Sequence, residues 1–232
     1  MINPLKKLRL VNVLAGVVCL LTACGSAPPP PDWQANAESS MAHAIEAYLL
    51  GNARVEAQEF LRASSEIART GRPDLSARLA LMHCAGRVAS LVMEPCVGFE
   101  KLRQDAAKPE RVYADYIAGT LSATEIEFLP PQHRAVAMAM VTAANHAGTA
   151  QALQNIVDPL ARLVAAGVVF GRGQANPTVI SLAVDTASAQ GWRRPLLAWL
   201  GVQRLRAEKA GDTGEAERIG RRMAMVEDAT AK

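Results

Sequence analysis

Apolar residues recur at helical spacing over most of the chain from about residue 35 onward. Between residues 37 and 49 they stand at i, i+4, i+7, i+8, i+11 and i+12, which places them on one face of an amphipathic helix. Similar stripes cover residues 57–68 and 75–92. The sequences "GNA" at 51–53 and "TGRPD" at 70–74 separate them, because glycine can end a helix and proline cannot continue one. The pattern predicts consecutive helices joined by short turns.

The later part of the chain shows the same pattern less regularly. Pro131, Pro177 and Pro195 stand near expected helix starts, where a missing N–H group is harmless, and Asn176 is a suitable N-cap. Pro159 lies inside a stripe that stays in phase, so a kink or a restart of the helix is expected there. No segment alternates in the manner of a β-strand. We therefore predict an all-α protein, with further helices near residues 96–105, 110–121, 131–147, 149–169, 177–190, 194–210 and 213–227.

The spacing of the expected helices resembles that of the tetratricopeptide repeat. Helix starts near residues 37, 74 and 109 are separated by 37 and 35 residues, close to the repeat period of about 34. The segment "LRAEKAGDTGEAERI" resembles the turn of that repeat through Gly211, Asp212 and Ala216. The middle of the chain lacks the consensus aromatic and glycine residues. We expect antiparallel helix pairs over residues 35–228, in a tetratricopeptide-like α-solenoid or an irregular helical bundle.

The net charge of the chain is concentrated near its beginning. Lys6, Lys7 and Arg9 lie within the first 23 residues, which contain no acidic residue. Without them the formal charge of +3 disappears, leaving 22 basic residues against 22 acidic ones. Nucleic-acid binding needs a basic surface that displaces counterions. We therefore do not expect nucleic acid as a partner.

Residues 1–23 have the features of an export signal, with a basic start followed by an apolar run too short to span a membrane. The sequence Leu21-Thr22-Ala23-Cys24 that ends it resembles the lipobox of bacterial lipoproteins. This resemblance implies cleavage before Cys24, a thioether between its sulfur and diacylglycerol, and acylation of its amine. Two or three acyl chains anchor a protein stably. The alternative is an ordinary signal peptide cut elsewhere; in either case Cys19 is discarded.

The residues after Cys24 bear on location. In enterobacterial lipoproteins an aspartate at the next position retains the protein in the inner membrane, so Gly25 and Ser26 favour the periplasmic face of the outer membrane over the inner one. Residues 24–34 contain four consecutive prolines, which favour an extended polyproline II tether. Such a tract can also bind an SH3-type domain, but after a lipid anchor a spacer is the preferred interpretation.

Cys84 and Cys96 are the two cysteines that remain in the domain. An exported protein meets an oxidising compartment, so the pair is a candidate disulfide. Cys84 falls in the middle of an expected helix and Cys96 lies beyond the turn, and a bridge needs Cα atoms within about 7 Å. We therefore expect that a bridge would require the first helix to end early, near Gly86. The alternative is two buried thiols.

Residues for catalysis, metal binding or cofactor binding do not form a recognisable motif. The four histidines (His43, His83, His133 and His146) lack metal-ligand spacing, and neither a Cys-x-x-Cys nor a Gly-x-Ser-x-Gly sequence occurs. Glu38-Ser39 matches the Glu-Ser dipeptide of lytic transglycosylases, whose other motifs are missing. We predict no catalytic residue, metal site or cofactor, and keep a peptidoglycan-acting enzyme of this type as the alternative function.

The first-choice function is a scaffold. The overall plan resembles that of helical-repeat lipoproteins that act as secretin pilotins or in outer-membrane protein assembly, and of small uncharacterised lipoproteins of proteobacteria. The resemblance implies a membrane-anchored protein that binds an envelope protein or peptide, and a helical array offers a concave face for it. Candidate contact residues on that face, chosen by residue type, are Tyr113, Tyr116, Arg193 and Arg194.

Overall fold

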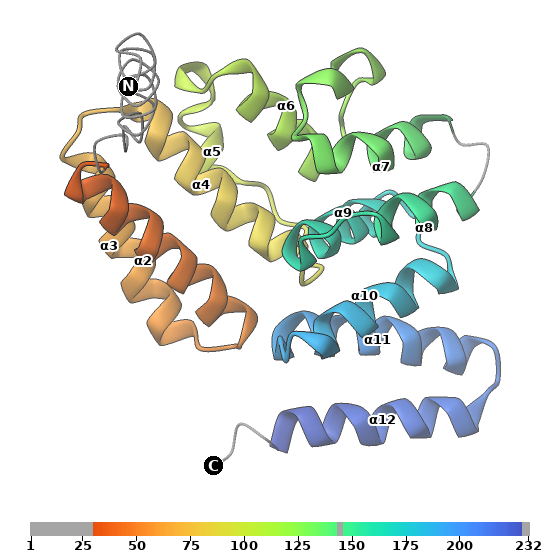
Figure 1. Cartoon of the computed structure of the whole chain (residues 1–232). Helices are drawn as coiled ribbons and strands as arrows, with labels where there is room; N and C mark the ends of the chain where they lie inside the picture. Colours follow the sequence, from red (N-terminus) through yellow and green to blue (C-terminus); the bar gives the residue numbers. More distant parts are fainter. Residues whose placement is uncertain (1–29, 143–145, 229–232) are drawn as a thin grey trace, which may run out of the picture. The chain divides into compact units, whose positions relative to one another are not determined.

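The computed structural model describes residues 30–142 and 146–228, and side chains from 143 to 147 are outside the description. The predicted signal peptide, Cys24 and most of the tether lie outside these residues. The described residues form helices and no strand, which confirms the all-α prediction (Figure 1). Residues from Trp33 onward belong to one compact unit.

The described helices follow one another with short connections. α2 begins earlier than the predicted start near residue 35. In chain order the elements are α2 (Asp32–Leu49), α3 (Ala53–Ala68), α4 (Pro73–Val88), α5 (Val97–Glu100), η1 (Arg103–Asp105), α6 (Lys108–Ile117), η2 (Ala123–Phe128), α7 (Pro131–Thr142), α8 (His146–Gln154), α9 (Pro159–Gly171), α10 (Pro177–Ala189), α11 (Arg193–Lys209) and α12 (Thr213–Asp228).

The predicted turns and caps are present. Gly51 and Gly71 adopt positive φ angles of 82° and 64° after α2 and α3, a conformation that glycine adopts without steric cost. The Asn176 side chain accepts a hydrogen bond of 2.9 Å from Val179 N at the start of α10, as expected of an N-cap. At Pro159 the chain restarts rather than kinks, because Asp158 caps a new helix by accepting a 2.6 Å bond from Ala161 N.

Consecutive helices pack as antiparallel pairs, and α9 additionally contacts helices far from it in sequence. It packs against α4, α6 and α7 as well as its neighbours α8 and α10. Every residue from Leu163 to Val169 is buried. At Gly167 an added Cβ would lie 2.3 Å from the Val88 carbonyl oxygen, so α9 approaches the end of α4 at backbone distance. Trp199 of α11 reaches the same place, where its Nε1 donates to Ala89 O at 3.1 Å.

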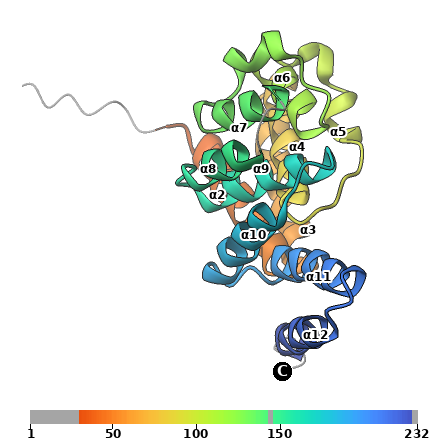
Figure 2. The same cartoon turned by 90° about the vertical axis from the view of Figure 1, so that its right-hand side faces the viewer.

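The last helices stack in order of sequence. α10 packs against α11 and α11 against α12, and Figures 1 and 2 both show α12 beside α11. α12 is an amphipathic helix whose Ala216 and Ile219 are buried while Met225 is exposed. This sequential stacking differs from the packing around α9, where several helices meet at one element.

The start of α11 is tied to the end of α2. Arg193 Nε donates to Leu50 O at 2.9 Å, and Arg194 Nε donates to Tyr48 O at 2.8 Å. The Arg194 guanidinium also lies 4.4 Å from the centre of the Tyr48 ring. Cations bound to the last carbonyl groups of a helix are favourably placed in its dipole field. Both candidate contact arginines therefore bind carbonyl groups within the fold.

Candidate functional site

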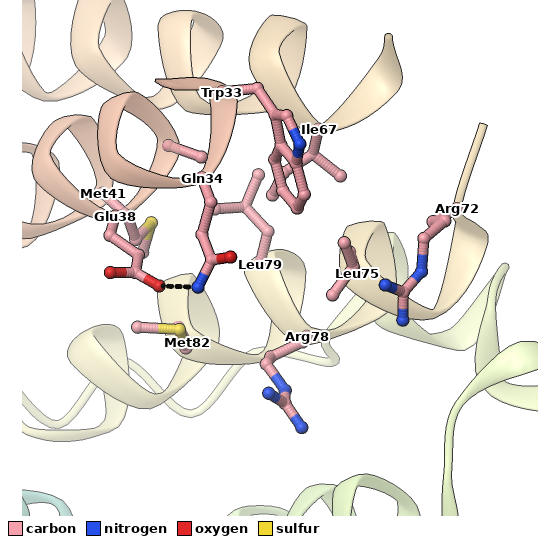
Figure 3. Close-up of a pocket in the computed structure, with 11 residues that line it drawn as sticks. Trp33, Gln34, Glu38, Met41, Ile67, Arg72, Leu75, Arg78, Leu79 and Met82 are labelled. Atoms are coloured by element: carbon pink, nitrogen blue, oxygen red, sulfur yellow. Dashed lines mark hydrogen bonds between the residues drawn. The ribbon is translucent and has the colours of Figure 1, made fainter. Parts of the chain in front are cut away.

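Two hollows meet on α4 and form the candidate site. The first, the α2 hollow, lies between the start of α2, the end of α3 and the start of α4, with a volume of about 390 Å³ (Figure 3). Its lining residues are Trp33, Gln34, Ala37, Glu38, Met41, Ile67, Arg72, Leu75, Arg78, Leu79 and Met82.

The floor of the α2 hollow is apolar. Ala37 and Met41 stand four residues apart on α2, and Leu75, Leu79 and Met82 follow the same helical spacing on α4. Residues at this spacing share one helix face, so both faces turn toward the hollow. Met41 and Leu79 are buried, whereas Met82 is 44% exposed. The hydrophobic pattern of the sequence marks Met82 as part of a stripe and gives no sign of this exposure.

The rim of the α2 hollow is polar. Gln34 Nε2 donates to Glu38 Oε1 at 2.9 Å across one turn of α2. Arg72 forms two hydrogen bonds with Asp74, of 3.2 and 2.6 Å, and this pair raises the pKa of the guanidinium and lowers that of the carboxyl. Arg78 Nε donates to Glu110 Oε1 at 3.0 Å. Figure 3 shows Glu38 and Gln34 on one side of the drawn residues and Arg72 on the other.

The second hollow, the α6 hollow, shares the lining residues Arg78 and Met82 with the first and has a volume of about 500 Å³. α6, η2 and the start of α7 supply its other walls. The lining residues are Arg78, Leu81, Met82, Pro109, Glu110, Tyr113, Phe128, Leu129, Pro130, Pro131 and Arg134. Because Arg78 and Met82 line both hollows, the two are neighbours on α4.

Charged groups surround the aromatic wall of the α6 hollow. Lys108 Nζ lies 3.8 Å from the centre of the Phe128 ring, a cation–π contact. Arg134 Nε donates to Leu129 O at 2.8 Å, so this exposed cation pairs with a carbonyl group. Glu110 uses Oε1 for Arg78, while its Oε2 is buried without a hydrogen-bond partner among the described residues. The hollow therefore combines apolar rings with cationic groups.

The two tyrosines proposed from the sequence lie in different environments. Tyr113 lines the α6 hollow, whereas Tyr116 is completely buried and so is not available as a contact residue. Both rings contact His133, with centroid distances of 5.4 and 5.2 Å. Burial lowers the pKa of His133 to about 4, although the charge of Asp158 opposes the shift. His133 is therefore an uncharged interior ring at neutral pH.

A buried polar cluster joins α3 to α4, and sequence analysis did not reveal it. Glu56 Oε1 lies 2.9 Å from His83 Nε2 and 3.2 Å from the nearer Arg87 nitrogen. Phe60 packs on the His83 ring at 4.5 Å. The only sequence signal was indirect, since Glu56, next to Ala57, lies at the edge of the apolar stripe of α3. We assign the cluster a structural role, because a buried carboxylate needs such partners.

Cys84 and Cys96 are joined by a disulfide in the structure, with Cα atoms 5.8 Å apart. α4 nevertheless continues to Val88. The chain turns at Leu91, which has a φ of 61°, and returns so that α5 begins beside α4. The expectation that the helix must end near Gly86 was wrong, because the returning segment supplies the close approach. The bridge lines a third hollow of about 450 Å³.

Among the described residues, no group of three or more His, Cys, Asp or Glu side chains could hold a metal ion. In that part of the chain, too, no helix combines the length and apolarity needed to cross a membrane. No family model matches the chain, and no curated protein and no solved structure matches it. The function is therefore inferred from the residues of the two hollows and from the sequence.

Proposed function

We propose that the protein is a lipid-anchored lipoprotein on the periplasmic face of the bacterial outer membrane, where it serves as an interaction or assembly scaffold. The observation that supports this best is the α6 hollow. It brings together Tyr113, Phe128, Arg78 and Arg134, and tyrosine and arginine are enriched among the residues that dominate interface energies. The antiparallel helix pairs are compatible with a degenerate tetratricopeptide-like array, which binds partners on helical surfaces.

The proposed occupant of the α6 hollow is an apolar segment of an envelope protein that carries an acidic side chain. Phe128 and the prolines around it offer an apolar surface for such a segment. The exposed Arg134 guanidinium pairs with the Leu129 carbonyl rather than with a carboxylate, so an acidic group of the partner complements it. Arg78 is already paired with Glu110 and contributes less.

The test of this site is crosslinking in cell envelopes followed by identification of the attached protein. A defined partner should be crosslinked by the unaltered chain and lost with Arg134→Glu, since the charge reversal repels an acidic segment, and with Phe128→Ala. Arg204→Glu is the matched control, because Arg204 is an exposed α11 arginine paired with Glu208. Equal crosslinking in all variants would show that the hollow is not the partner site.

The anchor is supported by the lipobox-like residues up to Cys24. Its test is fractionation of cell envelopes and mass measurement of the mature chain. The unaltered protein should fractionate with the outer membrane and carry the mass of a diacylglycerol thioether and an N-acyl chain. Cys24→Ala should release it into the soluble fraction, because without acyl chains the domain has no anchor. Continued membrane fractionation of Cys24→Ala would contradict the proposal.

A peptidoglycan-acting enzyme of lytic transglycosylase type is the second candidate, because Glu38 lines the α2 hollow. A general acid of this type acts from a largely buried position, whereas Glu38 is exposed and bonded to Gln34. Incubation of the purified domain with peptidoglycan distinguishes the two candidates. Release of anhydro-muropeptides that disappears in Glu38→Gln would establish the enzyme and overturn the scaffold.

A further inference from the structure

The floor of the α2 hollow belongs to a small hydrophobic cluster that is separate from the main core. The cluster consists of Ala37, Met41, Ala63, Ile67 and Leu79, with Ile45, Phe60 and Leu75 packed against it. Helices α2, α3 and α4 thus enclose an apolar space that remains open on one side, with a volume of about 390 Å³. Open apolar pockets of this size with a few polar groups at the mouth are typical of small-ligand sites.

The mouth of the α2 hollow carries two accessible guanidinium groups. The side chains of Arg72 and Arg78 are 55% and 62% exposed, and their partners are Asp74 and Glu110. The Arg72–Asp74 pair is exposed and contributes little to stability, so an incoming anion can share Arg72 at small cost, whereas Arg78 also pairs with the largely buried Glu110 carboxylate. The other charged group that lines the hollow, Glu38, is bonded to Gln34. Trp33 stands half-buried at the same opening and adds an amphipathic ring.

We propose that the α2 hollow binds the alkyl chain of an anionic amphiphile, with the chain on the apolar floor and the head on Arg72 and Arg78. A fatty acid and a membrane lipid share this chemistry. The source of the ligand, a nearby membrane, rests on the proposed lipid anchor at Cys24. Trp33 follows Cys24 by nine residues, which span about 30 Å at most. An anchored chain therefore keeps Trp33, and with it the hollow, near the surface of its own bilayer.

The first experiment measures binding of laurate by equilibrium dialysis to the mature chain from residue 24 with Cys24→Ser. Laurate should bind more tightly than decanoate by about fifteenfold, because each buried methylene contributes a factor of about four. Dodecylammonium, which has the same chain and a cationic head, should bind at least tenfold more weakly than laurate. No laurate binding, or equal binding of laurate and dodecylammonium, would overturn the proposal.

Variants then assign the binding to the α2 hollow. The double variant Arg72→Gln/Arg78→Gln should weaken laurate binding about tenfold; its circular dichroism is measured alongside, because Arg78→Gln removes the partner of the largely buried Glu110. The control is Arg62→Gln, which removes an exposed arginine of α3 that is paired with Glu59 and does not line the hollow. A loss of affinity in the control equal to that in the double variant would place the laurate elsewhere.

A second arm distinguishes the two sources of the ligand. Vesicles of phosphatidylcholine with phosphatidylglycerol should retain the unlipidated chain more than phosphatidylcholine vesicles do, and the double variant should lose this difference, if membrane lipid is the ligand. Laurate binding without vesicle retention assigns the hollow to free fatty acids. The absence of both laurate binding and vesicle retention would overturn the proposal. The binding experiments use a chain without the anchor, so a negative result would not contradict the lipid anchor. A negative result in the Cys24→Ala fractionation would likewise not contradict ligand binding in the α2 hollow.

Discussion

The region around α9 and the pair formed by α2 and α3 are stabilised in different ways. α9 is buried along most of its length and touches the backbone of α4 at Gly167. The α2–α3 pair shares a small cluster of apolar residues with α4, and part of this cluster stays open in the α2 hollow. Close packing without free space tolerates little change, whereas an open cluster can admit a ligand. This difference is why we propose ligand binding for the α2–α3 region and expect the greater rigidity around α9.

Polar contacts also hold the α2–α3 pair to the rest of the unit. The Glu56 cluster ties α3 to α4, and the arginines at the start of α11 bind carbonyl groups at the end of α2. Such bonds each contribute about 1 kcal/mol net. Substitutions around α9 should therefore cost more than those at the junction with α2.

The largest effect is expected for Gly167→Ala. The added Cβ would lie 2.3 Å from Val88 O, and a backbone atom cannot move aside without shifting α4 or α9. Overpacking of this kind should lower the free energy of unfolding by about 3 kcal/mol, measured by denaturant titration. Gly201→Ala is the control, because no heavy atom outside its own helix backbone lies within 4 Å of a Cβ there, and it should be neutral or slightly stabilising. Equal stability of both variants would contradict the close approach.

The disulfide should contribute nearly as much. Closing a loop of 12 residues restricts the unfolded chain by about 3 kcal/mol in the loop-entropy model, so the double variant Cys84→Ser/Cys96→Ser should lose about that stability. The bridge fastens α5 to α4, whereas no disulfide joins α2 or α3 within the described residues. Intact mass should show two hydrogens fewer than the reduced chain. Two reactive thiols in the unreduced protein would contradict the bridge.

The fold class could be predicted from the sequence to a large extent. Helical spacing and turn residues such as Gly51, Gly71 and Asn176 are local signals, and the elements they predict are present. Over 149–169 the in-phase stripe left a kink or a restart at Pro159 open, and the structure shows the restart, with α9 beginning at Pro159. η2 was not predicted, since a short 3₁₀ segment leaves no periodic pattern.

The hollows could not be predicted, because they depend on which helices become neighbours. Met82 belongs to an apolar stripe and is nevertheless half-exposed, while Tyr116, a candidate contact residue by its type, is buried. The roles of Arg193 and Arg194 require contacts with residues more than 140 positions earlier in the chain. Periodicity within one helix holds no information about such distant partners.

His133 should make the α9 side of the unit sensitive to acid. Its folded pKa of about 4 lies below the ordinary histidine pKa of 6.5, so the unfolded state binds more protons between these values and stability falls as the pH drops. The loss should approach 1.4 kcal/mol per pH unit in this window. Urea titrations from pH 7 to pH 4 measure it, and His133→Phe should flatten the dependence. An unchanged slope in that variant would assign the acid sensitivity to other groups.

The smallest effect is expected at the junction between α2 and α11. Arg194→Ala removes a hydrogen bond to Tyr48 O and a cation–π contact, and should lower stability by about 1 kcal/mol. Because the α2–α3 pair also keeps its ties to α4, hydrogen exchange should increase locally in the last turn of α2 and remain unchanged in α9. Arg206→Ala, which alters an exposed arginine of the same helix, is the control and should leave exchange in α2 unaltered. Increased exchange throughout α9 would show that the two regions unfold together, and would remove the distinction between a rigid centre and a loosely tied pair.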